Sequence, residues 1–230
     1  MKLRKRLAAV LLSAVMILTG LTACDGTTPA GPAELTWQNS RTKKYLDTKG
    51  ITAQEYTLTA DMMASGQKVE LKYAIKGKRA GYETAADSKL RVDGDGNVYL
   101  IGYKGSNKEL EWWQYPAGSQ SAESYAHSIR TCWGYFTLPT DQNVGSISAG
   151  KYKKDDKTYD TETLKVHQEN VYATYTYCYD GNELSFILVE PIVGMENIDL
   201  KPVADEAVLA IPSDYRVICL LYTSDAADDS

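Results

Sequence analysis

The two histidines are the first residues to weigh for chemistry, because imidazole serves both as metal ligand and as general base. His127 and His167 stand far apart, and neither belongs to a His-x-x-x-His or Cys-x-x-Cys spacing. The sequence therefore supports neither a zinc site nor a histidine-based triad. Glu109 and Glu111 would share one face of a strand as paired carboxylates, but a charged solvent face explains them more simply. We expect no enzyme activity, no metal and no cofactor.

One glycine-rich segment imitates two ligand-binding loops. Gly94-Asp95-Gly96-Asn97-Val98-Tyr99 lacks the third glycine of a dinucleotide fingerprint and leads into a strand, where a phosphate cradle requires a helix N-terminus. A calcium loop would need glycine at the position of Val98 and a glutamate further on. We predict a tight turn here.

Two of the four cysteines, Cys132 and Cys178, lie inside the main body of the chain. A single disulfide between them is compatible with a location outside the cytoplasm. Two small buried apolar side chains are the alternative interpretation. The sequence leaves both open.

Aromatic side chains are the remaining candidates for a binding site. Tyrosine is abundant, with 17 residues against two phenylalanines, and its ring suits half-exposed sheet faces and cavity walls. On strands, Trp112 and Trp113 point to opposite faces, whereas Tyr175, Tyr177 and Tyr179 share one. Packing within a sheet explains such rings. The sharper hypothesis is an apolar cavity, whose candidate lining residues are Tyr73, Trp112, Trp113, Tyr175, Tyr177 and Tyr179.

The N-terminus carries a targeting signal that ends in a cysteine with its own chemistry. A basic head, Lys2 to Arg6, precedes an apolar run that ends in Leu21-Thr22-Ala23-Cys24. This pattern resembles a bacterial lipoprotein signal with a lipobox, so residues 1–23 are expected to be removed and Cys24 to carry lipid. The membrane is then a partner through Cys24, and the domain is extracytoplasmic. It is anchored at the outer face of the cytoplasmic membrane or at another envelope membrane. Cleavage of a signal without lipid is the alternative.

The segments that flank the domain have their own character. Residues 24–33 are small, polar and interrupted by proline, which is typical of a flexible tether. Residues 219–230 resemble translated sequencing adapter, and we exclude them from the fold. Without the four basic residues of the signal and the three acidic residues of the tail, 21 basic and 27 acidic residues remain, for a net charge of −6. This charge argues against nucleic acid as a partner, and no protein partner is indicated.

The elements that must position these residues follow from periodicity. Residues 34–48 are compatible with a short helix, and from Gln54 apolar residues alternate with polar ones. Two runs around Ser65-Gly66 predict a hairpin, and turns then separate strands at 80–86, 89–93, 98–103 and 109–115. Residues 121–133 repeat at helical spacing and lead into an irregular loop around Pro139. Strands return at 158–167, 170–179, 183–189 and 197–201. The gross order is sheet, helical insert, sheet.

Several segments together resemble a known family of lipoprotein carriers. Tyr56–Ala60 followed by Val69–Arg79 resembles the opening hairpin of the LolA/LppX-like carriers. The hairpin Tyr177–Ile187 and the segment Val208–Tyr215, with its Ile-Pro-x-x-Tyr pattern, resemble the family's closing elements. The likeness spans about residues 53–218, describes sheet architecture and transfers no functional residue. Anchoring is a departure from the classical soluble carrier, though LppX-like members share it.

The resemblance implies the fold and the leading function. We expect a single α+β domain over residues 34–218, with a mainly antiparallel sheet curved into an incomplete β-barrel and a helical insert on its concave side. The implied function is non-enzymatic binding of a lipid or other apolar ligand in the half-barrel cavity. The alternative is a structural or protein-interaction module of the cell envelope, with a filled core and no ligand. An enzyme is disfavoured, because no nucleophile, base and orienting group can be assembled.

Overall fold

The computed structural model describes residues 34–64, 66–84, 88–104, 109–168, 171–189 and 193–218. The chain divides into two compact units, Met1–Glu34 and Leu35–Ser230, and the fold described here is that of the second unit. The expected signal peptide, lipidated Cys24, tether and adapter-like tail lie outside the described residues. All buried core residues of the described ranges belong to the second unit, so this unit has its own hydrophobic core.

Two helices occupy the segments where helices were predicted. A 3-10 helix, η1 (Trp37–Asn39), precedes α1 (Arg41–Thr48), and the Ser40 side chain caps α1 by accepting a hydrogen bond from the Lys43 N–H at 3.0 Å. The longer α2 (Gln120–Thr131) is capped by Ser119 in the same way. It ends two residues earlier than predicted, because Cys132 is already extended. A short α3 (Glu206–Leu209) lies near the C-terminus.

Strands make up most of the domain. Twelve belong to one sheet, in the order β14-β6-β5-β4-β3-β2-β1-β13-β12-β11-β10-β9. All neighbours are antiparallel except β14 and β6, and the sheet is not closed into a barrel, since β14 and β9 form its two ends. The prediction of a mainly antiparallel sheet is therefore confirmed. The strands of this sheet are β1 (Glu55–Ala64), β2 (Gln67–Lys76), β3 (Arg79–Thr84), β4 (Lys89–Val92), β5 (Val98–Lys104), β6 (Glu109–Tyr115), β9 (Val144–Lys154), β10 (Lys157–Gln168), β11 (Val171–Asp180), β12 (Glu183–Val189), β13 (Val193–Lys201) and β14 (Arg216–Val217).

Two parts of the central loop region differ from the prediction. The segment after α2 forms a small two-stranded hairpin, β7 (Cys132–Trp133) and β8 (Phe136–Thr137). No strand was predicted between the loop around Pro139 and residue 158, but residues 144–154 form the long edge strand β9, paired with β10. Gly145, Gly150 and a run of polar residues hide the two-residue alternation, because an edge strand exposed to solvent has little apolar surface to bury.

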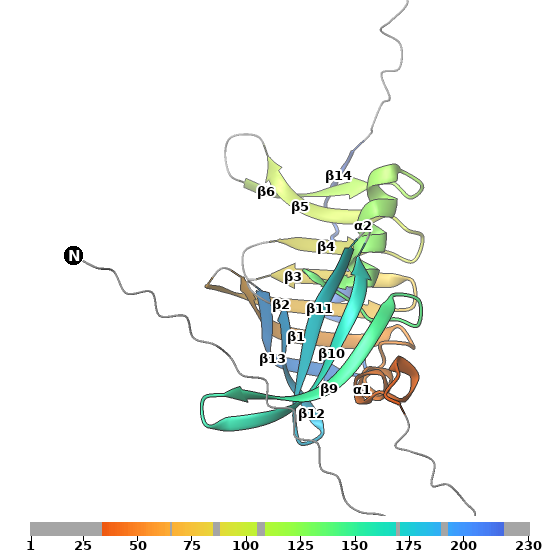
Figure 1. Cartoon of the computed structure of the whole chain (residues 1–230). Coiled ribbons are helices and arrows are strands. Elements are labelled where there is room, and N and C mark those ends of the chain that lie inside the picture. The colour runs from red at the N-terminus through yellow and green to blue at the C-terminus, as the bar shows by residue number, and fades with distance from the viewer. Residues whose placement is uncertain are drawn as a thin grey trace, which may run out of the picture. The chain divides into compact units, whose positions relative to one another are not determined.

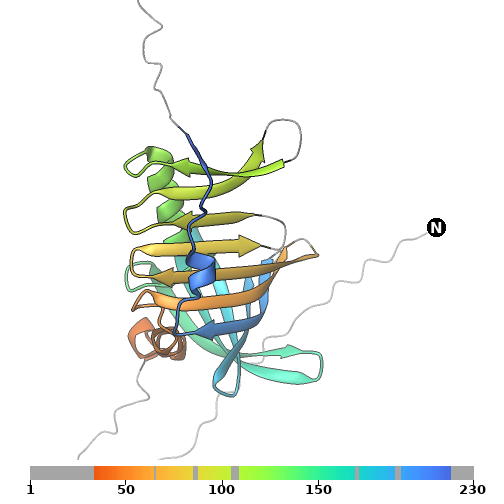
Figure 2. The ribbon, with the colours of Figure 1, turned by 180° about the vertical axis from the view of Figure 1, so that it is seen from behind.

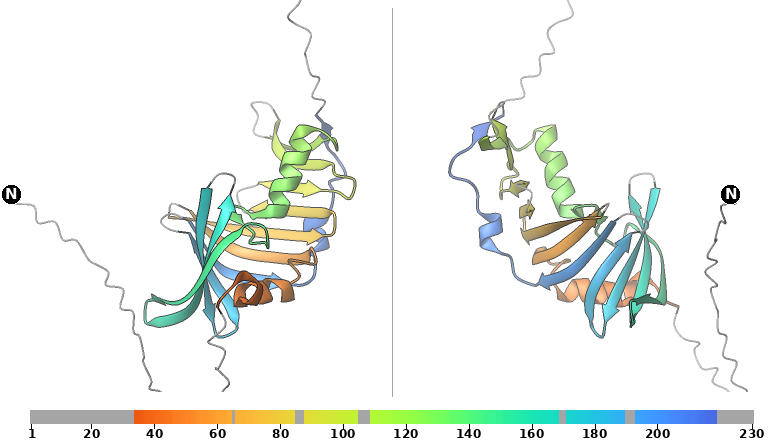
Figure 3. Two further views of the ribbon diagram at one scale, coloured as in Figure 1. Left: turned by 45° about the vertical axis from the view of Figure 1, so that its right-hand side comes forward. Right: turned by 90° about the vertical axis from the view of Figure 1, so that its left-hand side faces the viewer.

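The sheet bends sharply along its length. In Figure 1, β9, β10 and β11 cross in front of β1, β2 and β3, and α2 lies on the same side of the sheet as these crossing strands. Figure 3 shows α2 standing against the face formed by β3, β4 and β5. We call this covered side the inner face and the opposite side the outer face. The fold thus brings the two halves of the sheet and α2 around a shared core.

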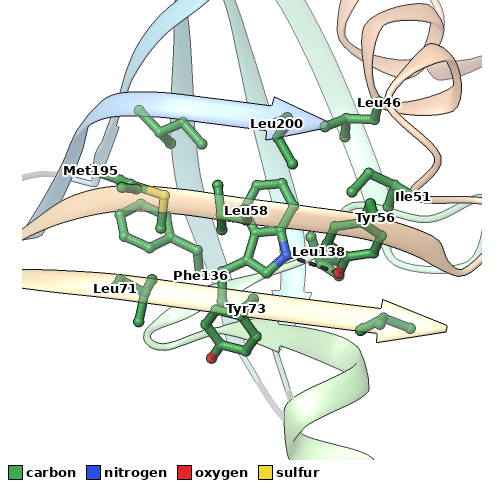
Figure 4. Packing of buried hydrophobic residues seen from close by; sticks show 14 of the residues in the cluster. Leu46, Ile51, Tyr56, Leu58, Leu71, Tyr73, Phe136, Leu138, Met195 and Leu200 are labelled. Atoms are coloured by element: carbon green, nitrogen blue, oxygen red, sulfur yellow. Dashed lines mark hydrogen bonds between the residues drawn. The ribbon is translucent and has the colours of Figure 1, made fainter. Parts of the chain in front are cut away.

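The core fills the space inside this bend. Tyr56, Leu58 and Tyr73 project from β1 and β2 to the side on which Phe136 of β8 lies (Figure 4). The dashed line in Figure 4 is the hydrogen bond that the Trp133 indole N–H donates to the Tyr56 hydroxyl at 3.1 Å. Trp133 and Phe136 are 0% and 1% exposed. The β7–β8 hairpin therefore packs into the inner face as a plug.

A C-terminal strap, residues 202–218, crosses the outer face from β13 to the β6 edge, as the view from behind shows (Figure 2). Lys72 pairs with Asp205 at 2.7 Å, while Val208 and Leu209 pack against Ala74. Gly81 on β3 permits the close approach, because a Cβ atom at this position would lie 2.0 Å from the Val208 carbonyl oxygen. Polar and apolar contacts together hold the strap on the sheet.

Candidate functional site

Four of the six predicted cavity residues belong to the packed core. The side chains of Tyr73, Tyr175, Tyr177 and Tyr179 point to the inner face and are between 1% and 4% exposed. Tyr175 packs against Phe136, with 5.7 Å between ring centroids. The three β11 tyrosines do share one face, as their spacing predicted, but this face is filled and not hollow.

The hydroxyl ends of these tyrosines fasten other elements to the sheet. The Tyr73 hydroxyl accepts a hydrogen bond from the Gly134 N–H at 2.6 Å, and the Tyr175 hydroxyl accepts one from the Thr137 N–H at 3.2 Å. These two contacts hold the β7–β8 hairpin in place. The Tyr179 hydroxyl donates to the Thr42 Oγ1 at 2.8 Å and so joins α1 to β11. A tyrosine is useful here because its ring is apolar while its hydroxyl satisfies polar groups at the edge of the core.

Burial also moves the ionisation of these phenols further above neutral pH. Desolvation raises the pKa of Tyr73, Tyr175, Tyr177 and Tyr179 above the ordinary value for tyrosine. Burial likewise raises the pKa of Tyr56 to about 12. All five hydroxyls are therefore protonated under physiological conditions.

Trp112 and Trp113 lie on opposite faces of β6, as predicted. Trp113 points to the inner face, where its indole N–H donates to the Glu111 carboxylate at 2.7 Å and its ring covers Gly102. Trp112 points to the outer face, where the Arg91 guanidinium lies 5.6 Å from its ring centroid. Both indoles are half-buried. These contacts show that both tryptophans pack against neighbouring residues of the sheet. They do not line a common cavity with the four tyrosines.

A cleft of about 1030 Å³ lies elsewhere on the domain. Its walls come from α1 and the turn that follows it, the C-terminal end of α2, the β7–β8 hairpin, the loop 138–143, and the adjoining ends of β10 and β11. None of the six predicted cavity residues lines this cleft. Its volume is in the range of small-molecule sites. Its lining includes Trp37, Lys43, Leu46, Asp47, Ile51, Gln54, His127, Ser128, Arg130, Leu138 and Asp141.

Hydrogen bonds between distant segments shape the cleft. The Trp37 indole N–H donates to the Asp141 carboxylate at 2.9 Å, which joins η1 to the loop 138–143. On another wall, the Arg130 guanidinium donates to the Gly77 carbonyl at 2.8 Å, and the Gly77 N–H donates to the Gln54 carbonyl at 2.8 Å. The end of α2, the β2–β3 turn and the turn after α1 are thus connected in series.

Three apolar side chains of the cleft lining are buried. Leu46, Ile51 and Leu138 are 3%, 8% and 5% exposed. Figure 4 shows all three at the end of β1 that carries Tyr56. Charged side chains lie around them, among which Lys43 pairs with Asp47 at 3.0 Å. A hydrogen bond from Thr52 and the pairing with Lys43 outweigh desolvation and lower the pKa of Asp47.

The structure also places the two histidines first weighed for chemistry and the glycine-rich segment at 94–97. His127 and His167 both contribute to the cleft lining, but within the described ranges no three His, Cys, Asp or Glu side chains gather to hold a metal. The predicted turn at 94–97 is present: the Asp93 carboxylate accepts hydrogen bonds from the N–H groups of Asp95, Gly96 and Asn97, each at 2.9 Å. Asp93 thereby closes an Asx-type turn.

Cys132 and Cys178 are free thiols, so the candidate disulfide is wrong. Cys132 lies on the inner side, where its sulfur is 3.8 Å from the Thr137 hydroxyl. Cys178 alternates with Tyr177 and Tyr179 along β11 and therefore points to the outer face. Burial raises the pKa of the Cys178 thiol to about 12. The alternative interpretation, a small buried apolar side chain, describes Cys178 well.

No family model matches this sequence, and no curated protein matches it. Among the described helices, none combines the length and apolar character needed to cross a membrane.

Sequence reasoning missed the cleft because no local motif marks it. Trp37, Arg130 and Asp141 come from η1, α2 and the loop 138–143. In the sequence, each of them looks like an ordinary surface residue. Only the tertiary contacts bring them to one place. A weak signal was present in Arg130, which follows the apolar Ile129 at the end of a predicted helix, but that signal also fits compensation of the helix dipole.

Proposed function

We propose that this protein is a membrane-anchored, extracytoplasmic lipoprotein that binds a lipid or other apolar ligand without catalysing a reaction. Lipid on Cys24 would hold it at the outer face of the cytoplasmic membrane or at another envelope membrane. The domain would be an incomplete β-barrel of the LolA/LppX-like kind, with α2 as the helical insert on its concave side. The bend of the sheet and the position of α2 on the inner face support this description.

The observation that carries the proposal is the cleft of about 1030 Å³ between α1 and the end of α2. A ligand cavity behind the four tyrosines has no support, because those rings are buried in the core. The ligand is therefore placed in the cleft, where Leu46 and Ile51 offer an apolar floor. A site of this size with a few polar groups is typical of small-molecule binding.

The test compares two serines on α2 that are one helical turn apart. Ser124 and Ser128 are both exposed, but only Ser128 lines the cleft. Residues 34–218 would be purified, extracted with organic solvent for bound lipid, and titrated with a fluorescent long-chain fatty acid. We expect binding that Ser128→Trp weakens at least tenfold and Ser124→Trp leaves unchanged. An empty extract together with no uptake of the fatty acid would refute ligand binding.

A second candidate is a structural or protein-interaction module of the cell envelope. The filled interior favours it, since Trp133, Phe136 and the buried tyrosines leave the inner face solid. Under this hypothesis the cleft binds no small apolar molecule. Cross-linking of the lipidated protein in its host membrane, with and without Ser128→Trp, separates the two candidates. A protein adduct lost only in that variant, combined with no fatty acid binding, would favour the module.

A further inference from the structure

Arg130 differs from the other charged residues of the cleft in its partners. It lies in the last turn of α2, is half-buried, and donates one hydrogen bond to the Gly77 carbonyl at 2.8 Å. Among the described residues it forms no ion pair with any carboxylate, in contrast to Lys43, which pairs with Asp47. Asp141, an exposed carboxylate on another wall, accepts the Trp37 indole N–H. The guanidinium charge of Arg130 is therefore uncompensated by a direct partner.

The surroundings make this charge costly unless an anion neutralises it. Burial lowers the pKa of Arg130, as expected for a cation removed from water. A guanidinium has five N–H donors, and one of those on Arg130 is used on Gly77. Donors remain for a carboxylate or phosphate, which guanidinium binds in a bidentate manner.

The apolar floor of the cleft lies beside this charge. Leu46, Ile51 and Leu138 line the same cleft as Arg130 and lie at the end of β1 that carries Tyr56 (Figure 4). Arg130 is connected to this end through Gly77 and Gln54, and the Gln54 N–H donates to the Ile51 carbonyl at 3.1 Å. An uncompensated cation next to buried apolar side chains matches a molecule with an anionic head and an apolar chain. A free anion would leave the floor empty, and a neutral lipid would leave Arg130 without a counter-charge.

We propose that Arg130 binds the carboxylate or phosphate head of a single-chain anionic amphiphile whose apolar chain lies on Leu46, Ile51 and Leu138. This inference rests on the proposed function and specifies the ligand class at the same cleft. Arg130 also lies where a cation compensates the C-terminal dipole of α2. The test must therefore separate recognition of a ligand from stabilisation of the helix.

Residues 34–218 would be titrated calorimetrically with dodecyl phosphate, dodecanoate, dodecanol and inorganic phosphate. The two dodecyl anions would be kept below their micelle-forming concentrations, and dodecanol below its solubility limit. We expect the dodecyl anions to bind at least tenfold more tightly than dodecanol, since a charge-assisted hydrogen bond contributes at least that factor. Arg130→Gln should abolish this difference and leave dodecanol binding unchanged. Arg130→Lys should recover most of it, because the charge is kept. Lys165→Gln on the exposed side of β10 is the control.

The outcomes distinguish this inference from the proposed function. If dodecanol and the dodecyl anions bind equally and Arg130→Gln changes neither, the anionic head is refuted while apolar binding stands. If inorganic phosphate binds as tightly as dodecyl phosphate, the site recognises a free anion and the amphiphile is refuted. If none of the four compounds binds, both proposals fail. Thermal melts of each variant report any loss of helix stability separately, and a purely structural Arg130 would lower the melting temperature without changing selectivity.

Discussion

The carboxylate of Glu162 on β10 holds the N-terminus of α1 through Thr42. One carboxylate oxygen accepts the Thr42 N–H at 2.6 Å, and the other accepts the Arg41 N–H at 2.9 Å. Glu162 and Thr42 are 6% and 0% exposed. A carboxylate at a helix N-terminus satisfies free N–H groups and interacts favourably with the helix dipole. This contact fixes α1, and with it one wall of the cleft, against the far half of the sheet.

Removal of this carboxylate should destabilise the domain. Glu162→Ala leaves two N–H groups of α1 without their acceptor, and we expect a loss of about 2–3 kcal/mol in the free energy of unfolding. Glu162→Gln keeps one oxygen and should lose about half as much. Urea unfolding followed by circular dichroism measures both values. Glu70→Ala, at an exposed position of β2, is the control, and a Glu162→Ala value equal to the control would disprove the role of this contact.

The strap on the outer face should depend on the absence of a side chain at Gly81. In Gly81→Ala the new Cβ would lie 2.0 Å from the Val208 carbonyl oxygen, so the strap or β3 must move. We expect a loss of at least about 2 kcal/mol in stability and faster hydrogen exchange in α3. Gly94→Ala, where a Cβ meets nothing within 4 Å, should stay within about 0.5 kcal/mol of the native protein. Equal behaviour of the two variants would contradict the close approach.

The buried tyrosines should make the domain sensitive to alkali. Burial raises the folded-state pKa of Tyr56 to about 12 and that of Tyr177 well above its ordinary value. The stabilisation is complete below the unfolded-state pKa of about 10 and is lost as the pH rises towards the folded-state values. We expect these phenols to ionise together with unfolding, seen as a cooperative rise in phenolate absorbance. Tyr177→Phe should move this transition to higher pH, and gradual ionisation without loss of structure would argue against it.

The thiols of the domain should react according to their burial. Cys178 is 0% exposed and its pKa is raised to about 12, whereas Cys132 is partly exposed. In the native state of residues 34–218, a thiol reagent should modify Cys132 slowly and leave Cys178 intact. Both should react after unfolding, and a reducing agent should leave the melting temperature unchanged. Detection of fewer than two thiols in the unfolded protein would restore the disulfide hypothesis.

Lipidation can be tested in the full chain. Growth of an expressing bacterium with an alkyne-labelled fatty acid should label the protein and place it in the membrane fraction. Cys24→Ala should remove the label while the domain still folds. Labelling that survives this substitution would show that another residue carries the lipid. Release of an unlabelled protein from the parent chain would favour cleavage of a signal without lipid.

The strands that bury one face could be predicted with good accuracy from local pattern. Alternation along two runs predicted a hairpin in which Tyr56 and Leu58 share a face of one strand, and the structure confirms this hairpin as β1 and β2. The Asp93 turn and the opposite faces of Trp112 and Trp113 could also be predicted, because a two-residue period and a turn depend only on neighbouring residues. The edge strand β9 could not be predicted, since it buries too few side chains to show a two-residue alternation of apolar and polar residues.

What lies opposite each apolar face was decided only by the tertiary structure. The sequence alone indicated an antiparallel sheet whose Tyr175, Tyr177 and Tyr179 share one side, and it left both a cavity and a packed core open. The bend of the sheet and the inserted Trp133 and Phe136 resolved this in favour of packing. The cleft arose where separate segments meet. Periodicity is a property of one strand, whereas a cavity depends on contacts between residues that are distant along the chain.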